Sequence, residues 1–341
     1  MNALGDTDGN ASQKRPNVFS GPSAMRDFLD PAHSMSLPLV ELPDSLNPFR
    51  KEKVRIFAKL MYLSPLFNIK LLAALNLLTE AHESGKLEGV HTIVENSSGN
   101  MVLAESVVGR MFGIKRVLAI VPRDIAPGKL DLLRLFGVDP LLSNESPGEP
   151  SGIAKARELG NQPGFFNPGQ YENDANPRAY EKWLAPQIWE ETDGMMTIFC
   201  AGLGTTGTIV GASRYLRKKS PGISIVGVTC KENEPVPGVR SVSRLKEIKF
   251  DWRASLDHHF EVTTKESFRY SLELCRVGLM GGPSSGFALA GLMEFLEAQA
   301  ASALDALRNK DGEVVAVFVC PDSALLYLEK YSTHLDPQEL A

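Results

Sequence analysis

The chain has 341 residues, 43% of them hydrophobic, which is more than one small core needs and predicts two lobes of ordinary size. Its formal net charge of −5 comes without any block of like charge, so no basic field is available to hold a phosphate backbone. We therefore expect no nucleic-acid partner.

The first 35 residues are polar and rich in Gly, Ser and Asn, with little that could be buried. We expect residues 1–35 to form a flexible extension. The early sequence lacks the charged, apolar and small-residue regions of a signal peptide, and no apolar run reaches membrane-spanning length. These features predict a cytoplasmic protein without a membrane partner.

From residue 36 onward, apolar β-branched runs alternate with runs of helical periodicity. The runs predicted as strands are 54–63, 90–95, 115–121, 194–201, 223–230 and 313–320. The runs predicted as helices are 69–84, 100–113, 209–219 and 287–299. This alternation predicts an α/β protein with a doubly wound, mostly parallel sheet and right-handed crossovers.

The cysteines and histidines of the chain show no pattern that is typical of metal binding. No pair of cysteines has the CxxC spacing, and the six histidines lack metal-ligand spacing. We expect no metal, and we interpret the cysteines as reduced thiols that are mostly buried: Cys200, Cys230, Cys275 and Cys320.

The segment from Gly202 to Thr208 lies between a predicted strand and a predicted helix, and it holds three glycines and three threonines. The first N–H groups of such a helix point back into the loop, where the helix dipole adds partial positive charge, so the loop suits an anion such as a phosphate ester. Its spacing matches neither the dinucleotide pattern nor the P-loop pattern. A tight packing turn is the alternative interpretation.

A second loop, from Ser97 to Asn100, has the same place between a predicted strand and a predicted helix. Two helix starts suited to anions indicate a ligand with two anionic ends, such as a phosphorylated cofactor joined to an amino-acid carboxylate. An ordinary Ser/Asn helix cap is the alternative interpretation.

Lys70 is a lone lysine in the otherwise apolar segment "SPLFNIKLLAAL". Such a lysine either extends its charge to solvent or lies in a site where desolvation lowers its pKa and makes the amine usable.

Five motifs follow one another along the chain: "SPLFNIK" with Lys70, "SSGN", "GTTGT", "GPSSG" and "CPDSALLYL". In this order and at these separations they resemble the fold type II pyridoxal-phosphate (PLP) enzymes over residues 36 to 330. Within these enzymes the chain is similar to the cysteine synthase and cystathionine β-synthase group. The resemblance implies the two-lobed, tryptophan synthase β-like fold, PLP as the cofactor, a small-molecule amino-acid substrate and a homodimer.

The resemblance also implies a division into domains. The expected division is a large PLP-binding domain of residues 36–74 and 186–330, a small mobile substrate-binding domain of residues 75–185, and a C-terminal tail of residues 331–341.

Roles for single residues follow from the same resemblance. Lys70 aligns with the lysine that binds PLP covalently and removes the substrate's α-proton. Asn100 matches the asparagine that binds the phenolic oxygen of PLP. Ser284 matches the serine beside the pyridine nitrogen, with Ser285 as the alternative. A hydroxyl in place of a carboxylate beside the pyridine nitrogen of PLP implies that this nitrogen is not fully protonated. The cofactor is then a weaker electron sink, which favours β-elimination. The residues matching the loop that holds the PLP phosphate are Gly204, Thr205, Thr206, Gly207 and Thr208.

For the substrate, the resemblance assigns the carboxylate to the loop with Ser97, Ser98 and Asn100, assisted by Gln170. The double threonine of "AGLGTTGT" and an arginine at position 240 resemble O-phosphoserine-using cysteine synthases and siderophore-type N-(2-amino-2-carboxyethyl)-glutamate synthases. An arginine at Arg240 suits a phosphate leaving group, and a surface arginine is the alternative interpretation.

Some residues depart from the group's pattern. Leu71 and Leu72 replace the Asp-Arg that follows the lysine, Leu66 and Phe67 replace small residues before it, and Met101 replaces a threonine. These changes leave the cofactor cradle in place but make the expected substrate pocket more apolar.

The expected activity is PLP-dependent β-replacement on O-phospho-L-serine or O-acetyl-L-serine. The substrate would lose its β-substituent to give an aminoacrylate, which then accepts a sulfur or amine nucleophile. Two alternatives are a serine/threonine ammonia-lyase and a non-catalytic relative with a binding or regulatory role.

Overall fold

The computed structural model of the chain describes residues 17–34, 36–143, 150–299 and 301–341. Its contacts divide the chain into two units, residues 1–36 and residues 37–341. In the first unit, α1 (Ala24–Leu29) carries Phe28, whose ring meets that of Phe19 edge to face at 5.5 Å. About half of the extension expected at residues 1–35 lies outside the described residues, and its flexibility stays a prediction.

The larger sheet of the second unit has six strands in the order β1-β2-β10-β7-β8-β9. Every neighbouring pair is parallel except β1 and β2, so the predicted mostly parallel α/β class is confirmed. The strands are β1 (Leu39–Glu41), β2 (Val54–Leu60), β7 (Ile198–Gly202), β8 (Ser224–Cys230), β9 (His258–Val262) and β10 (Val314–Cys320).

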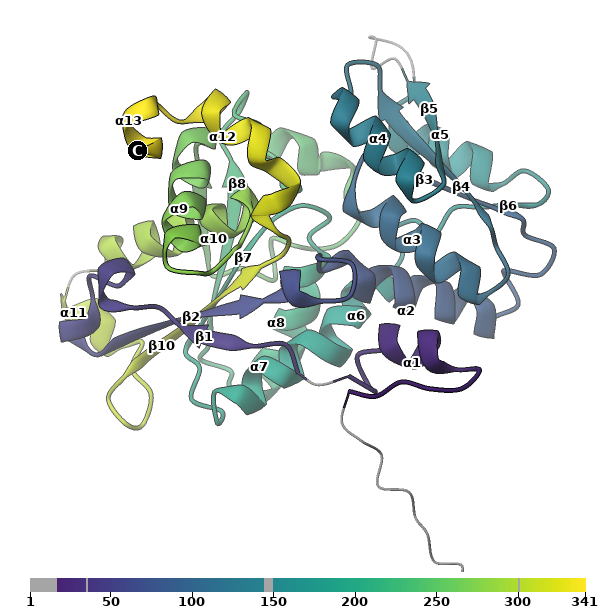
Figure 1. The fold of residues 1–341 in the computed structure, drawn as a ribbon. Helices are drawn as coiled ribbons and strands as arrows, with labels where there is room; N and C mark the ends of the chain where they lie inside the picture. Colours follow the sequence, from purple (N-terminus) through teal and green to yellow (C-terminus); the bar gives the residue numbers. More distant parts are fainter. Residues whose placement is uncertain (1–16, 35, 144–149, 300) are drawn as a thin grey trace, which may run out of the picture. The chain divides into compact units, whose positions relative to one another are not determined.

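The smaller sheet is fully parallel, in the order β5-β4-β3-β6. Its strands are β3 (Thr92–Asn96), β4 (Arg116–Pro122), β5 (Val138–Ser143) and β6 (Phe165–Phe166). Figure 1 shows these strands gathered with α3 (Asn100–Met111), α4 (Pro127–Leu135) and α5 (Gly152–Gly160). We call this part, residues 92–166, the small lobe, and the part built on the six-stranded sheet the large lobe.

The remaining helices belong to the second unit. They are α2 (Lys70–Glu83), α6 (Ala175–Ala179), α7 (Ala185–Glu191), α8 (Gly207–Lys219), α9 (Thr264–Arg276), α10 (Pro283–Ala298), α11 (Ala301–Asp305), α12 (Leu328–His334) and α13 (Pro337–Leu340). α2 runs unbroken across the expected domain boundary at residues 74 and 75, and α13 lies in the expected tail. The expected domain division stays a prediction.

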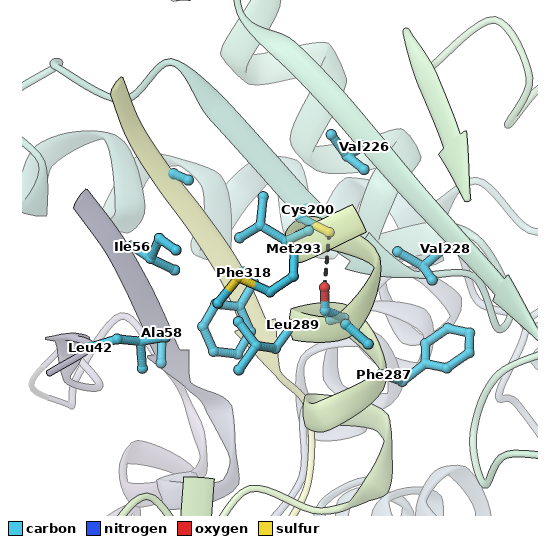
Figure 2. Close-up of a cluster of buried hydrophobic side chains, with 14 of the residues drawn as sticks. Leu42, Ile56, Ala58, Cys200, Val226, Val228, Phe287, Leu289, Met293 and Phe318 are labelled. Carbon is cyan, nitrogen blue, oxygen red and sulfur yellow. Dashed lines mark hydrogen bonds between the residues drawn. The ribbon is translucent and has the colours of Figure 1, made fainter. Parts of the chain in front are cut away.

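The core of the large lobe is centred on β10 and α10. All seven residues of β10 are buried, and α10 is apolar around most of its circumference, which is typical of a helix surrounded by protein. Figure 2 shows α10 side chains such as Leu289 and Met293 packed with Phe318 of β10, while the Cys200 thiol donates to the carbonyl oxygen of Ala288. α10 begins at Pro283, four residues before the predicted helix, because proline is favoured in the first turn.

The carboxyl ends of several parallel strands converge on one region of the molecule. β3 leads into α3, and β7 leads into α8, so the amino ends of both helices lie where these strands end. β10 ends next to the start of α2, because the Ile69 amide donates to the Pro321 carbonyl oxygen over 2.7 Å. Such convergence is the usual place for a ligand in an open α/β sheet.

Two negative findings apply to the described part of the chain. None of its helices combines the length and the apolar character needed to cross a membrane. No three His, Cys, Asp or Glu side chains within residues 17–34, 36–143, 150–299 and 301–341 lie close enough together to hold a metal ion.

Candidate active site

A cavity of about 590 Å³ lies at this convergence and is lined by residues of both lobes. The residues singled out from the sequence that line it are Lys70, Ser97, Ser98, Asn100, Gln170, Gly204, Thr205 and Arg240. Four others, namely Thr206, Gly207, Thr208 and Ser284, lie outside this lining. A larger hollow of about 780 Å³ lies elsewhere on the surface, but its charged residues Arg178 and Glu80 pair with each other, so we place the site in the smaller cavity.

Lys70 is the first residue of α2, and the turn before it is held firmly. The Lys70 amide donates to the Asn68 side-chain oxygen over 2.9 Å, and Asn68 is almost fully buried. Burial lowers the pKa of the Lys70 amine from 10.5 to about 8; nearby Asp322 opposes this shift, and Arg240 adds to it. Lys70 is partly exposed, and it lines the cavity. The lowered pKa leaves a larger share of its amine uncharged near neutral pH than in an ordinary lysine.

The glycine-rich loop between β7 and α8 is shaped by close packing. A Cβ on Gly204 would lie 2.3 Å from the Gly238 carbonyl oxygen, and one on Gly207 would lie 2.4 Å from the Asn176 side-chain oxygen. The tight packing turn considered from the sequence is therefore present. It does not exclude anion binding, because the same loop precedes the amino end of a 13-residue helix.

Two threonines of this loop have different surroundings. Thr205 Oγ1 accepts hydrogen bonds from Asn176 Nδ2 over 3.0 Å and from the Gly207 amide over 3.4 Å. Thr206 has a left-handed backbone with φ of 66°, and its buried hydroxyl has no protein partner within the described residues. Thr208 is half-buried in the first turn of α8. A buried hydroxyl without a partner is costly unless a ligand satisfies it.

Asn100 connects the small lobe to the end of β10. It is the first residue of α3, and its Nδ2 donates to Asp322 Oδ2 over 2.8 Å. The same side chain also interacts with Tyr327 and lines the cavity. The preceding residues Ser97 and Ser98 line the cavity from the same loop.

Asp322 is a site residue that the sequence analysis quoted within "CPDSALLYL" but did not single out. It is 2% exposed, and its carboxylate accepts hydrogen bonds from three side chains. Oδ1 accepts from Ser284 Oγ over 3.0 Å, and Oδ2 accepts from Asn100 and, over 2.5 Å, from the Tyr327 hydroxyl. Burial raises the pKa of Asp322, while these donors and the Lys70 charge oppose the rise. An acidic residue two positions after the last apolar strand was the available signal.

The two serines at the start of α10 have different surroundings. Ser284 donates to Asp322, whereas the Ser285 hydroxyl is buried near Gly281 and has no protein hydrogen bond among the described residues. The structure thus connects Ser284, through Asp322, to Asn100 in the cavity lining.

Gln170 is held beside the second loop by a buried carboxylate. Glu95 accepts from the Asn96 amide over 2.8 Å and from the Gln170 amide over 3.3 Å. Burial raises the pKa of Glu95 to about 7, and burial together with the nearby Glu95 charge raises the pKa of Glu105 well above its ordinary value. Both carboxyl groups were missed from the sequence, since one lies within an apolar strand and the other within an apolar helix.

Arg240 lies over an aromatic ring at the edge of the cavity. Its guanidinium carbon is 4.9 Å from the centre of the Tyr171 ring, and Tyr171 in turn donates to the Asn96 carbonyl oxygen over 2.8 Å. Arg240 Nη1 donates to the Arg244 carbonyl oxygen over 3.4 Å. Within the described part of the chain, Arg240 forms no ion pair with a carboxylate. A guanidinium in this arrangement can accept an anionic ligand.

The residues that depart from the expected pattern are largely buried. Leu71, Leu72 and Met101 are at most 4% exposed, and only Met101 among them lines the cavity. Phe67 is exposed and has a left-handed backbone with φ of 55°. The cavity wall beside Asn100 is therefore more apolar than a threonine at position 101 would make it.

Comparisons with known proteins agree with this geometry. Residues 36–320 match the sequence model of a family described as pyridoxal-phosphate dependent enzymes. The chain is 31% identical to a cysteine synthase of Helicobacter pylori strain J99 over 287 residues, which cover 82% of the chain and 90% of that protein. It is 33% identical to cysteine synthase 3 of Caenorhabditis elegans over 187 residues, which cover 54% of the chain and 55% of that relative.

Among solved structures, the chain resembles an O-acetylserine dependent cystathionine β-synthase from Helicobacter pylori. The TM-score is 0.72 and the identity 27%, with 90% of this chain and 97% of that chain covered.

Proposed function

This chain belongs to the family of pyridoxal-phosphate dependent enzymes, and on that basis we propose that it catalyses β-replacement on an activated L-serine. The observation that carries the proposal is a Lys70 amine with a lowered pKa in a cavity that is also lined by Gly204 and Thr205, just before the start of α8, and by Arg240, which has no carboxylate partner among the described residues. The cysteine synthases among the relatives support this reaction class.

The residues present fit the cofactor. The unpartnered Thr206 hydroxyl and the backbone at the start of α8 suit the phosphate of PLP, together with Gly204, Thr205, Gly207 and Thr208. Asn100, which lines the cavity at the start of α3, suits the phenolic oxygen, and Ser284 suits the pyridine nitrogen. When bound, PLP supplies an electron sink for the electron pair left at the substrate's α carbon.

Lys70 has two tasks in this proposal. Its Nζ would hold the cofactor, and the same nitrogen, when uncharged, would accept the proton from the substrate's α carbon. Burial supports both tasks, because it lowers the pKa of Lys70 to about 8 and leaves a useful fraction of the amine uncharged near neutral pH.

The substrate carboxylate is proposed to bind at the start of α3. Ser97 and Ser98 line the cavity there, and Gln170 lies beside them because Glu95 holds its backbone amide. We also propose that the small lobe closes over a bound substrate and excludes water.

Arg240 supports O-phospho-L-serine as the preferred substrate over O-acetyl-L-serine. The phosphate leaving group would meet the guanidinium that lies over Tyr171. After phosphate has left, a sulfur or amine nucleophile can bond to the substrate's β carbon in its place.

The proposed reaction is tested by mixing the PLP-loaded protein with either activated serine and either sulfide or an amino acid. We expect a change in the visible absorbance of the cofactor on adding the serine derivative, and a β-substituted alanine by mass spectrometry. Formation of a 2-oxo acid from serine or threonine without a nucleophile would show the lyase reaction. No spectral response to either derivative contradicts the proposal.

Replacing Arg240 with glutamine should lower kcat/KM for O-phospho-L-serine by about 10- to 100-fold, the value of one or two charge-assisted hydrogen bonds. Activity with O-acetyl-L-serine should change little, because its acetyl ester is uncharged and offers the guanidinium no anionic oxygens. Arg253→Gln is a matched control, since Arg253 also lies over an aromatic ring, that of Trp252 at 4.2 Å, but outside the cavity lining. Equal losses with both substrates would contradict this role of Arg240.

Covalent loading of Lys70 with PLP should depend on pH. Because the pKa is about 8, the uncharged fraction of the amine should fall about tenfold per pH unit below that value and reach a plateau above it. Loading rates measured from about pH 6 to about pH 10, followed by borohydride trapping and mass spectrometry of the residue 70 peptide, check this. A midpoint near the ordinary lysine value of 10.5 would show that the amine is not desolvated.

A further inference from the structure

The charged residues that line the cavity are mostly cations. Among the described residues of the lining, four are basic and one is acidic: Lys70, Lys129, Arg240, Arg244 and Glu247. The whole chain has a formal net charge of −5, so this excess of positive charge is local. A concave surface with one sign of charge attracts ligands of the opposite sign. Lys70 and Arg240 already have tasks in the proposed function, and Arg244 and Glu247 are exposed, so Lys129 is the partly buried cation that remains.

Lys129 lies at an unfavourable place in its own helix. It is in the first turn of α4, which begins at Pro127 and has no acidic residue in that turn. The N-cap residue, Ala126, provides no side-chain hydrogen bond. Because a helix start carries partial positive charge, a lysine there destabilises the helix slightly. This placement indicates that the charge of Lys129 acts outside the helix.

The Lys129 ammonium also lacks a partner within the protein. In the described part of the chain it forms no hydrogen bond, and no carboxylate lies within ion-pair distance of it. Burial lowers the pKa of Lys129 and the like charge of Lys330 adds to this shift, while Asp322 and Glu329 oppose it. An anion bound in the cavity would offset the cost of burying this charge.

The wall around Lys129 is apolar. Leu132 follows it by three residues, so the two side chains lie on the same face of α4, and both line the cavity. Ile120, near the carboxyl end of β4, lines the cavity as well. One cation among aliphatic side chains suits a ligand with an acid group on a short carbon chain.

We infer that Lys129 determines specificity for the second substrate by binding an acid group of the nucleophile, so that a thiol or amine that carries a carboxylate is preferred over sulfide. This inference rests on the proposed function, which assigns protein groups to the cofactor, to the carboxylate of the activated serine and to the leaving phosphate. It assigns none to the nucleophile.

The chemistry of the proposed reaction is unchanged by this assignment. The bond between the substrate's β carbon and the phosphate oxygen breaks, and phosphate leaves with both electrons. The sulfur or nitrogen of the nucleophile then bonds to that carbon and gives up its proton, while the α carbon first loses and then regains one proton. Lys129 forms and breaks no covalent bond in these steps.

The test compares two thiols of similar size, mercaptoacetate with a carboxylate and 2-mercaptoethanol without one, as nucleophiles for the PLP-loaded protein. Lys129→Gln should raise the KM for mercaptoacetate about tenfold, the value of one charge-assisted hydrogen bond, with little change in kcat. The KM for 2-mercaptoethanol should stay within about twofold of wild type. Each comparison is made within one thiol, so the different reactivities of the two thiols cancel.

Two further variants make the result specific to the charge at this position. Lys129→Arg keeps the charge, and its KM for mercaptoacetate should stay close to that of wild type. Lys115→Gln is the matched control, because Lys115 is an exposed lysine of the same lobe outside the cavity lining, and both KM values should be unchanged.

Equal changes of KM for both thiols in Lys129→Gln overturn the inference, and so does no change for either. The same measurements with O-acetyl-L-serine in place of O-phospho-L-serine separate another role: a loss that appears only with the phosphate ester, and equally for both thiols, would show that Lys129 meets the leaving phosphate instead. In all three cases the β-substituted alanines still form, so the proposed function stands. If neither thiol gives a product, the proposed function and this inference fall together.

Discussion

Replacing Lys70 with alanine should lower kcat for β-replacement by at least about 10³-fold, the largest effect on activity that we expect from any substitution in the cavity. The variant removes both the amine that holds the cofactor and the base that takes the α-proton. Lys70 begins α2 beside Asp322 and Arg240. Steady-state turnover of O-phospho-L-serine with sulfide measures the effect.

The matched control is Lys86→Ala, which removes an exposed lysine outside the cavity lining and should keep wild-type turnover. Mass spectrometry after borohydride treatment should find the cofactor attached to wild-type protein and to the control, but not to Lys70→Ala. Turnover of the variant within tenfold of wild type would refute the assignment of Lys70 as the base.

Glu191→Gln should destabilise the folded protein by about 3 kcal/mol, the largest stability effect that we expect from removing one charge. Lys59 lies within β2 with a side chain that is 0% exposed, and both Glu191 carboxylate oxygens contact its amine, at 2.7 and 2.8 Å. Burial lowers the pKa of Lys59, and Glu191 opposes that shift. Without the carboxylate, the ammonium either stays buried with weaker partners or loses its proton.

Urea unfolding of the protein without cofactor measures this difference, because ligand binding would add its own stabilisation. Asp139→Asn is the control: Asp139 pairs with Arg116, but both side chains are more than half exposed, so the loss should stay below about 1 kcal/mol. The double variant Lys59→Met with Glu191→Leu should recover most of the stability. Equal losses for Glu191→Gln and Asp139→Asn would show that the buried pair contributes no more than an exposed one.

Much of the fold could be predicted because its signals are local. The alternation of β-branched runs with helical periodicity indicated β2, β3, β4, β7, β8 and β10 within a few residues of their observed bounds. Short or exposed strands such as β1, β6 and β9 were missed, because three residues, two residues or an alternating half-exposed pattern carry little periodicity.

The candidate site likewise contains residues with a local sequence signal and residues without one. Lys70, the loop at Ser97 to Asn100 and the loop at Gly204 to Thr208 each carry a signal within a few neighbouring residues, and most of their members line one cavity. Asp322 carries a weaker local signal, an acidic residue just after the last apolar strand, and nothing in that signal indicates its partners. It meets Asn100 across 222 residues of chain and Ser284 across 38, and no local pattern reports such contacts.

From the residues alone one can read which segments become strands and helices, which loops are suited to anions, and which amine stands apart in an apolar run. Only the tertiary structure determines the contacts between groups that are distant in the sequence. These are the burial that lowers the pKa of Lys70, the Asp322 carboxylate that binds both Asn100 and Ser284, and the Tyr171 ring beside Arg240. The physical reason is that backbone conformation depends on near neighbours along the chain, whereas desolvation and hydrogen bonding depend on which surfaces the packed sheets and helices bring together.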